Sequence, residues 1–178
     1  MTGYAPRIDA AFDAYLNASR VLLSAIATVM FVIMLAANAW NIGLRSFAAQ
    51  GVTWHQEVSI LAAFWIYFGA YALIAKADGY VRVEFLADRL PAPAQRAIAL
   101  LVQAVVIAFH LMVLRLCLTM LQVVRIYETP ILQWPEYLFY LPLAVGTADI
   151  LITECIRTVR LLVPRLRLAP AAGAAPPR

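Results

Sequence analysis

Arg115 is the side chain that most clearly calls for a chemical explanation, because it interrupts an otherwise apolar stretch at 97–124. A stretch of this length can cross a bilayer as a helix, and an arginine at mid-helix costs about 2.5–3.5 kcal/mol. Its guanidinium could bind an anionic substrate, or pair with a carboxylate on a neighbouring helix or subunit. Alternatively, its long stem carries the charge towards the headgroups. A buried partner is the favoured interpretation, and direct substrate contact is the least favoured.

Two histidines raise the possibility of electron transfer, because membrane helices can hold b-type haem between facing imidazoles. His110 lies near the middle of its apolar stretch, whereas His55 belongs near the outer boundary, so the two are not expected to face each other. We therefore interpret His110 as a packing residue with satisfied hydrogen bonds. A haem- or quinone-associated electron-transfer subunit stays the alternative function. Cys117 and Cys155 are interpreted as buried free thiols.

Motifs for redox disulfides, zinc proteases, serine hydrolases and phosphate-binding loops do not occur in the sequence. We therefore expect a protein that is not an enzyme and that has no catalytic residues, cofactor or metal site. Two acids, Asp149 and Glu154, lie near the end of the last apolar stretch. They could relay protons or sodium ions, but carboxylates close to the boundary are the favoured interpretation, with Glu154 paired to Arg157 one turn later.

The stretch at 97–124 carries polar residues on two faces of the expected helix. One face consists of Gln103, His110 and Cys117, which recur every seven residues. The other, about 130° round the axis, consists of Arg115, Thr119 and Gln122. Lipid would suit neither face, so the pattern favours protein neighbours on both sides and hence a partner subunit.

Composition fixes the class of protein, since 64% of the residues are hydrophobic, 13% are charged and the mean hydropathy is +0.80. A water-soluble domain is close to half apolar and a quarter charged, so a soluble fold is excluded. The sequence predicts an all-α integral membrane protein, with four transmembrane helices in a single domain over 1–163. The expected spans are 21–40, 58–75, 97–124 and 137–152. In the last span, Pro142 should kink the helix and Gly146 permits close packing.

The basic residues predict the orientation of these spans. Eleven of the 14 lie in the termini and the middle connection, two lie in the other connections, and one is Arg115 inside a span. Because cytoplasmic segments are enriched in arginine and lysine, we expect both termini in the cytoplasm. This scattered arrangement does not indicate nucleic-acid binding. The sequence at 37–39 is similar to a signal-peptide cleavage site, but retention of the first span is favoured.

Two amphipathic segments are expected outside the spans. Residues 6–19 place apolar and acidic residues on opposite faces, which is typical of a helix at the membrane surface, although a soluble extension leading into the span is equally compatible. Residues 82–90 show a similar pattern but also fit a short extended piece. The tail at 164–178, rich in alanine, proline and arginine, is expected to be disordered.

The order of residues along the chain carries a family resemblance. Trp54 suits the headgroup layer, and Glu57 suits the N-terminal end of the second span. Together with the residues around them, these form an ordered set: Asn41, Arg45, Trp54, Glu57, Trp65, Gly69, Arg82, Pro142 and Gly146. This order resembles the DctQ-like small membrane subunit of tripartite ATP-independent periplasmic (TRAP) transporters. With Arg115, these residues are the candidates for partner contacts or structural roles.

The resemblance implies a non-catalytic scaffold subunit in the bacterial inner membrane. Its partners would be a large multi-span permease subunit, a periplasmic solute-binding protein and membrane lipid. The transporter would be a sodium symporter importing organic acids, with the substrate and sodium sites in the large subunit. The sequence itself agrees, because it has no inverted repeat and no cluster of intramembrane acids such as secondary transporters use.

Overall fold

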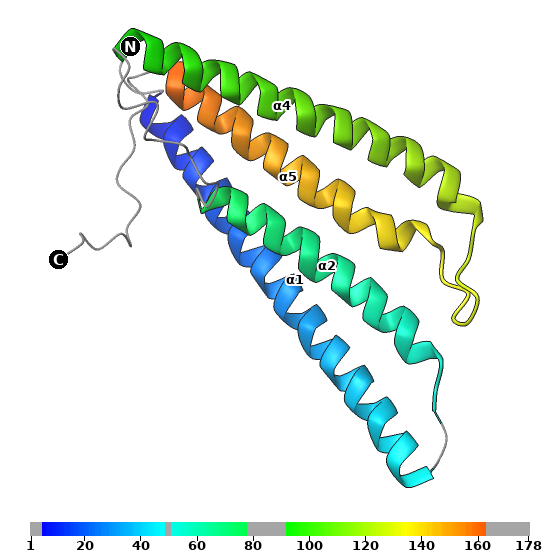
Figure 1. The fold of residues 1–178 in the computed structure, drawn as a ribbon. Coiled ribbons are helices and arrows are strands. Elements are labelled where there is room, and N and C mark those ends of the chain that lie inside the picture. The colour runs from blue at the N-terminus through cyan, green and yellow to red at the C-terminus, as the bar shows by residue number, and fades with distance from the viewer. Residues whose placement is uncertain (1–4, 49–50, 78–91, 163–178) are drawn as a thin grey trace, which may run out of the picture.

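The protein is described by a computed structural model over residues 5–48, 51–77 and 92–162. These residues form four long helices, α1 (Ala5–Ala48), α2 (Trp54–Lys76), α4 (Ala92–Val123) and α5 (Tyr137–Leu162), and a 3₁₀ turn, η1 (Val124–Ile126), that continues α4 (Figure 1). Each long helix holds a segment long and apolar enough to cross a bilayer, namely Asp9–Phe47, Trp54–Lys76, Ala97–Ile126 and Tyr137–Leu162. The prediction of an all-α membrane protein with four spans is therefore confirmed.

Two helices run well beyond the spans expected from hydropathy. Residues 6–19 are the opening turns of α1, and no break separates them from the span at 21–40. Helix α5 continues past 152 to Leu162. The amphipathic segment at 82–90, with Arg82 in it, and the tail at 164–178 lie outside the described residues.

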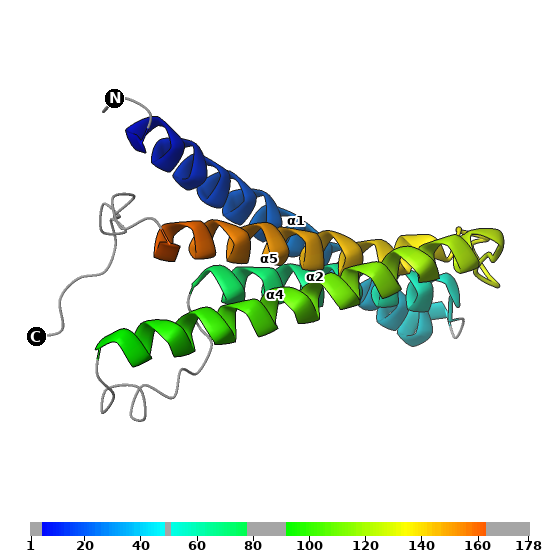
Figure 2. The ribbon, with the colours of Figure 1, turned by 90° about the horizontal axis from the view of Figure 1, so that it is seen from above.

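The helices lie side by side in the order α1, α2, α5, α4 (Figure 1). Helices α2 and α5 form the middle and pack on each other, while α1 packs mainly on α2 and α4 mainly on α5. Seen from above, α1 crosses the other helices at an angle (Figure 2). Helix α1 begins and α5 ends at one end of the molecule, called the termini end below. The α1–α2 and α4–α5 connections lie at the opposite end, the loop end.

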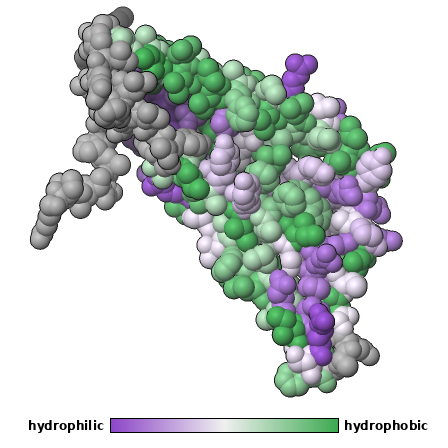
Figure 3. Space-filling model, viewed as in Figure 1, coloured by the Kyte–Doolittle hydropathy of each residue, from purple (hydrophilic) through white to green (hydrophobic). Residues whose placement is uncertain are grey.

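Small side chains let the middle helices approach closely. The core cluster consists of Leu23 from α1, Ala72 and Ala75 from α2, and Ile150 from α5. Close approach matters in a membrane, because lipid chains are as apolar as leucine and helix association then depends on van der Waals contact. Many large apolar side chains instead point outwards, as lipid contact requires. Figure 3 shows hydrophobic residues over much of this surface, with hydrophilic residues at the loop end and also beside the grey atoms at the termini end.

Candidate functional site

Asn41 closes the connection between α1 and α2. Its side chain is buried, and its Oδ1 accepts a hydrogen bond from the backbone N–H of Val52 at 3.1 Å. Its Nδ2 lies 3.2 Å from Nε2 of His55, whose Nδ1 contacts the Val52 carbonyl. These contacts fit a neutral imidazole that donates from Nδ1 and accepts at Nε2. Asn41 and His55 therefore hold the chain in position where it turns from one span into the next.

Arg45 and Trp54 flank this turn. The exposed Arg45 lies in the last turn of α1, and a Cβ built on Gly51 would be 3.5 Å from its Cγ, which is ordinary contact. Trp54 is the first residue of α2 and is half-buried. The resemblance grouped both residues with Asn41, and the structure brings all three to the same connection.

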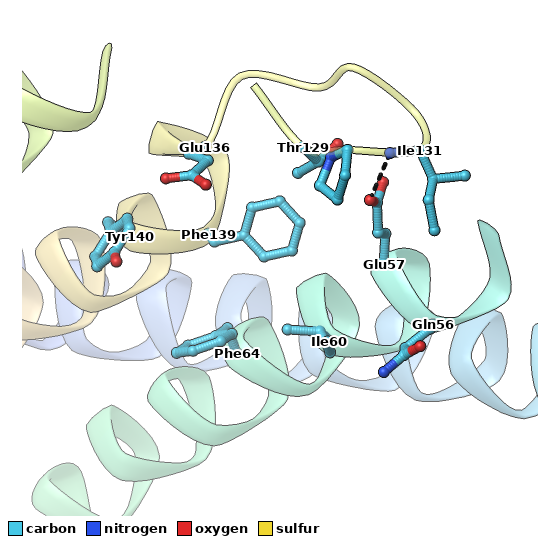
Figure 4. A pocket seen from close by; sticks show the side chains of 10 residues that line it. Gln56, Glu57, Ile60, Phe64, Thr129, Ile131, Glu136, Phe139 and Tyr140 are labelled. Atoms are coloured by element: carbon cyan, nitrogen blue, oxygen red, sulfur yellow. Dashed lines mark hydrogen bonds between the residues drawn. The ribbon is translucent and has the colours of Figure 1, made fainter. Parts of the chain in front are cut away.

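Glu57, in the first turn of α2, fastens the loop end across a long sequence separation. Its carboxylate is buried and accepts two consecutive backbone N–H groups from the α4–α5 connection. Oε1 accepts from Ile131 at 2.9 Å, as Figure 4 shows, and Oε2 accepts from Leu132 at 2.9 Å. Hydrogen bonds to an ionised acceptor are stronger than neutral ones. Glu57 therefore does more than complement the dipole of its own helix, because it joins the two hairpins of the fold.

The loop that Glu57 binds has its own internal order. Thr129 N–H donates to the Trp134 carbonyl at 2.8 Å, and the Thr129 hydroxyl accepts from the Trp134 N–H at 3.0 Å. Gln133 takes a left-handed conformation, with φ of 54°. These bonds present the N–H groups of Ile131 and Leu132 towards α2. Sequence reasoning missed this contact, because backbone donors in a loop carry no sequence pattern.

A hollow of about 420 Å³ lies beside Glu57 between α2 and α5 (Figure 4). Its lining is mainly apolar and includes Ile60, Phe64 and Phe139, with Glu136 at the α5 side. Since the Glu57 carboxylate is already occupied by backbone donors, it does not present a free charge to the hollow. Below, Asn41, His55, Glu57 and Thr129 are called the loop-end cluster.

A second polar group, at the termini end, joins three helices. Lys76 of α2 forms an ion pair with Asp149 of α5 and donates to the Ser19 hydroxyl of α1 at 2.7 Å. Tyr15, also in α1, donates to Asp149 at 2.9 Å. The Lys76 and Asp149 side chains are only 2% and 10% exposed, so the charges compensate each other away from water.

A further set of contacts brings in α4. Glu154 pairs with Arg157 at 2.8 Å, which confirms the predicted pair, and its carboxylate and carbonyl accept from Gln103. Arg157 also donates to the Ala75 carbonyl of α2 at 2.7 Å. The termini-end cluster is thus the following set: Tyr15, Ser19, Lys76, Gln103, Asp149, Glu154 and Arg157. These acids form fixed pairs with neighbouring basic groups.

Sequence reasoning missed Lys76, the single lysine of the chain, because the second expected span ends at residue 75 and leaves Lys76 in the middle connection. A signal for it exists in the helical spacing. Lys76 shares a face of α2 with the buried Gly69 and Ala72, and Asp149 shares a face of α5 with the buried Pro142 and Gly146. Small residues on one face of a membrane helix indicate contact with another helix. A charged residue on the same face is therefore expected to lie in that interface.

Gly146 and Gly69 lie where one helix contacts the backbone of another. A Cβ on Gly146 would lie 3.0 Å from the Phe68 carbonyl oxygen, so α5 touches the backbone of α2 there. At Gly69 the nearest atom would be the Leu23 carbonyl oxygen of α1, at 3.7 Å. Pro142 is fully buried within α5.

The two histidines do not face each other. His110 is buried, donates from Nδ1 to the Val106 carbonyl at 2.8 Å and stacks on Tyr71, whose hydroxyl is 3.4 Å from Nε2. Tyr71 lies sixteen residues beyond His55 on α2, about 24 Å along the axis. Haem could not bridge that distance within one chain. His110 is therefore a packing residue with both ring nitrogens engaged, as its position predicted.

Other predicted residues lie apart from both clusters. Trp65 is half-buried on α2, and Arg115 is exposed on α4 with no ion pair or hydrogen bond from its side chain among the described residues. Cys117 is buried, but Cys155 is exposed. The expectation of a buried thiol is therefore wrong for Cys155, which faces outwards from α5.

These observations define a multi-pass helical membrane protein whose interior charges, over the described residues, join helices to one another. No group of three or more potential metal ligands occurs in that same part of the chain. The sequence matches the family model for tripartite ATP-independent periplasmic transporters, DctQ component, over residues 34–164. The chain belongs to this family and is a TRAP transporter small permease subunit. No curated protein matches it.

Proposed function

We propose that this subunit is a non-catalytic scaffold in a sodium-coupled, receptor-dependent importer of organic acids. It would brace a large multi-span permease subunit, which holds the substrate and sodium sites, and the solute would arrive on a periplasmic solute-binding protein. The observation that supports the proposal is that the following buried charged side chains are already bound by other groups of the same chain. Lys76, Asp149, Glu154 and Glu57 are each engaged by another part of the same chain.

A scaffold needs rigid joints, and the two clusters supply them. Glu57 joins the two hairpins at the loop end, and Lys76 with Asp149 joins α1, α2 and α5 at the termini end. Between them, Gly146 sets the contact of α5 with α2. A helix bundle with contacts at both ends and in the middle would keep its shape while a partner subunit moves against it.

We assign the bacterial inner membrane as its location and place both termini in the cytoplasm, so that the loop-end cluster faces the periplasm. The excess of basic residues in the termini and middle connection supports this orientation. The arrangement is self-consistent, since Arg160 near the end of α5 reaches Asp13 near the start of α1 at 2.6 Å.

Reconstitution tests the proposal. Liposomes that contain this subunit with its large permease subunit should take up an organic acid when the solute-binding protein and an inward sodium gradient are supplied. Liposomes with the small subunit alone should show no uptake, and removal of the sodium gradient should abolish uptake by the pair. Uptake by the small subunit alone, or a pair that never co-purifies, would refute the proposed role.

A further inference from the structure

The outward face of α4 carries polar side chains that have no partner on another helix among the described residues. Arg115, Thr119 and Gln122 are all exposed, and they share one face because they follow at i, i+4 and i+7. The Thr119 hydroxyl donates to the Arg115 carbonyl of its own helix at 3.0 Å. Over the described residues, the side chains of Arg115 and Gln122 have no partner. The opposite face of α4, with His110 and Cys117, is the one that packs on the protein.

Helix α4 is the most open of the four spans. Only 6% of its most apolar window is buried within the chain, against 44% for α5. It stands at the edge of the molecule, with α5 as its main neighbour (Figure 1). The stripe of Arg115, Thr119 and Gln122 therefore faces whatever surrounds the subunit in the membrane.

The position of Arg115 argues against simple contact with headgroups. It lies eleven residues before Ile126, the end of the apolar segment, which is about 16 Å along the axis. The Cα–Cβ bonds of a helix tilt towards its N-terminus, so the Arg115 stem starts away from the nearer boundary and towards the middle of the span. A guanidinium at this depth lies within the hydrocarbon, where a fixed charge needs an opposite charge.

We infer that this face of α4 docks a transmembrane helix of the large permease subunit, and that an aspartate or glutamate on that helix pairs with Arg115. The planar guanidinium matches a carboxylate through two parallel hydrogen bonds, which favours this partner over a neutral side chain. Gln122, two turns nearer the boundary than Arg115, offers an amide to the same neighbour. The inference rests on the proposed function, because it requires the large subunit as a partner.

The experiment is co-purification of the co-expressed pair, with the affinity of the purified subunits measured in lipid nanodiscs. Arg115→Leu should weaken association at least about tenfold, because the partner's carboxylate would be left buried and unpaired. Arg115→Glu should weaken it further, and Arg115→Lys should weaken it less. The matched control is Arg125→Leu, which removes an exposed arginine at the boundary end of the same segment and should leave the affinity unchanged.

A second measurement separates docking from folding. The thermal stability of the isolated small subunit should be unchanged or raised by Arg115→Leu, because the Arg115 side chain has no hydrogen bond or ion pair to lose among the described residues. A photoreactive amino acid at Thr119 should crosslink to the permease subunit, and one at Met120, which is on a different side of α4, should not. The crosslinked peptide identifies the acid, and its change to arginine should restore binding to the Arg115→Glu variant.

The outcomes distinguish the two proposals. If the wild-type pair associates but Arg115→Leu and Arg115→Glu bind as tightly as wild type, Arg115 faces lipid, and the docking inference is wrong while the scaffold role stands. If crosslinks from Thr119 reach only phospholipid, the same conclusion follows. If the wild-type pair does not associate at all, both proposals fail.

Discussion

The two ends of the bundle both contain buried carboxylates, but different groups stabilise them. At the loop end, one carboxylate, Glu57, is satisfied by backbone N–H groups of a connection. At the termini end, the carboxylates form ion pairs with basic side chains: Asp149 with Lys76, and Glu154 with Arg157. The first arrangement fixes the course of a loop, whereas the second fixes the relative positions of helices. Each end should therefore fail in its own way when a single group is removed.

Loss of one buried charge at the termini end should have the largest effect. Lys76→Met leaves the carboxylate of Asp149 without its counter-charge, which should lower the free energy of unfolding by about 3–5 kcal/mol. The double variant Lys76→Met with Asp149→Leu removes both charges and should recover much of that loss. Thermal unfolding followed by circular dichroism in detergent measures both. Equal losses in the single and double variants would show that the pair does not compensate.

A substitution midway between the ends should come next. Gly146→Ala places a Cβ 3.0 Å from the carbonyl oxygen of Phe68, which is too close for ordinary contact. Overpacking of this kind costs about 1–3 kcal/mol of folding free energy. Gly69→Ala is the matched control, because its nearest neighbour at 3.7 Å permits the methyl group. The control should be neutral or stabilising by about 0.5–1 kcal/mol, since alanine favours the helix. The same unfolding assay compares the two, and a costlier Gly69→Ala would contradict the assigned packing.

At the loop end the expected effect is local. Glu57→Gln keeps the shape of the side chain but replaces one acceptor with an amide NH₂, so one of the two backbone donors loses its bond. Hydrogen exchange at the amides of Ile131 and Leu132 should accelerate, with a smaller change in global stability than Gly146→Ala produces. Glu128→Gln, an exposed acid in the same connection, is the control. Unchanged hydrogen exchange at both amides would contradict the local role assigned to Glu57 at the loop end.

The smallest effect is expected where the termini end meets water. Arg160 pairs with Asp13, whose side chain is 50% exposed. Arg160→Gln should cost about 0–1 kcal/mol, and added salt should reduce the wild-type advantage because exposed pairs are screened. Unfolding at low and high salt measures this. A loss as large as that of Lys76→Met would mean that burial does not set the difference between the two pairs.

The spans were predictable because the hydropathy that identifies a span is a property of one continuous segment of sequence. A run of apolar residues must satisfy its own backbone in lipid, so length and composition were enough. The Glu154–Arg157 pair was predictable for the same reason, since its partners are one turn apart. The helical period also separated the two polar faces of α4. His110 and Cys117 are buried on one face, whereas Arg115 is exposed on the other, for which the sequence predicted a protein neighbour.

Contacts between helices were not predictable in the same way. Lys76 and Asp149 are far apart in the sequence. Hydropathy leaves Lys76 in the middle connection, and Asp149 has a sufficient local explanation as a carboxylate near the end of a span. The period of a helix gives the side on which a residue lies but not the neighbour it meets. The same limit applied to Glu57, whose acceptor role depends on how the α4–α5 connection folds back over α2.

The uninterrupted course of α1 has a consequence for the surrounding lipid. Its 44 residues give an axis of about 66 Å, whereas the hydrocarbon core is about 30 Å thick. A straight rod of this length must lean steeply, protrude, or do both, and the angle it adopts depends on bilayer thickness. Because α2 packs along α1, a change in acyl-chain length would change the tilt of the α1–α2 hairpin as a unit. Hydrophobic mismatch is therefore a physical variable that acts directly on this subunit.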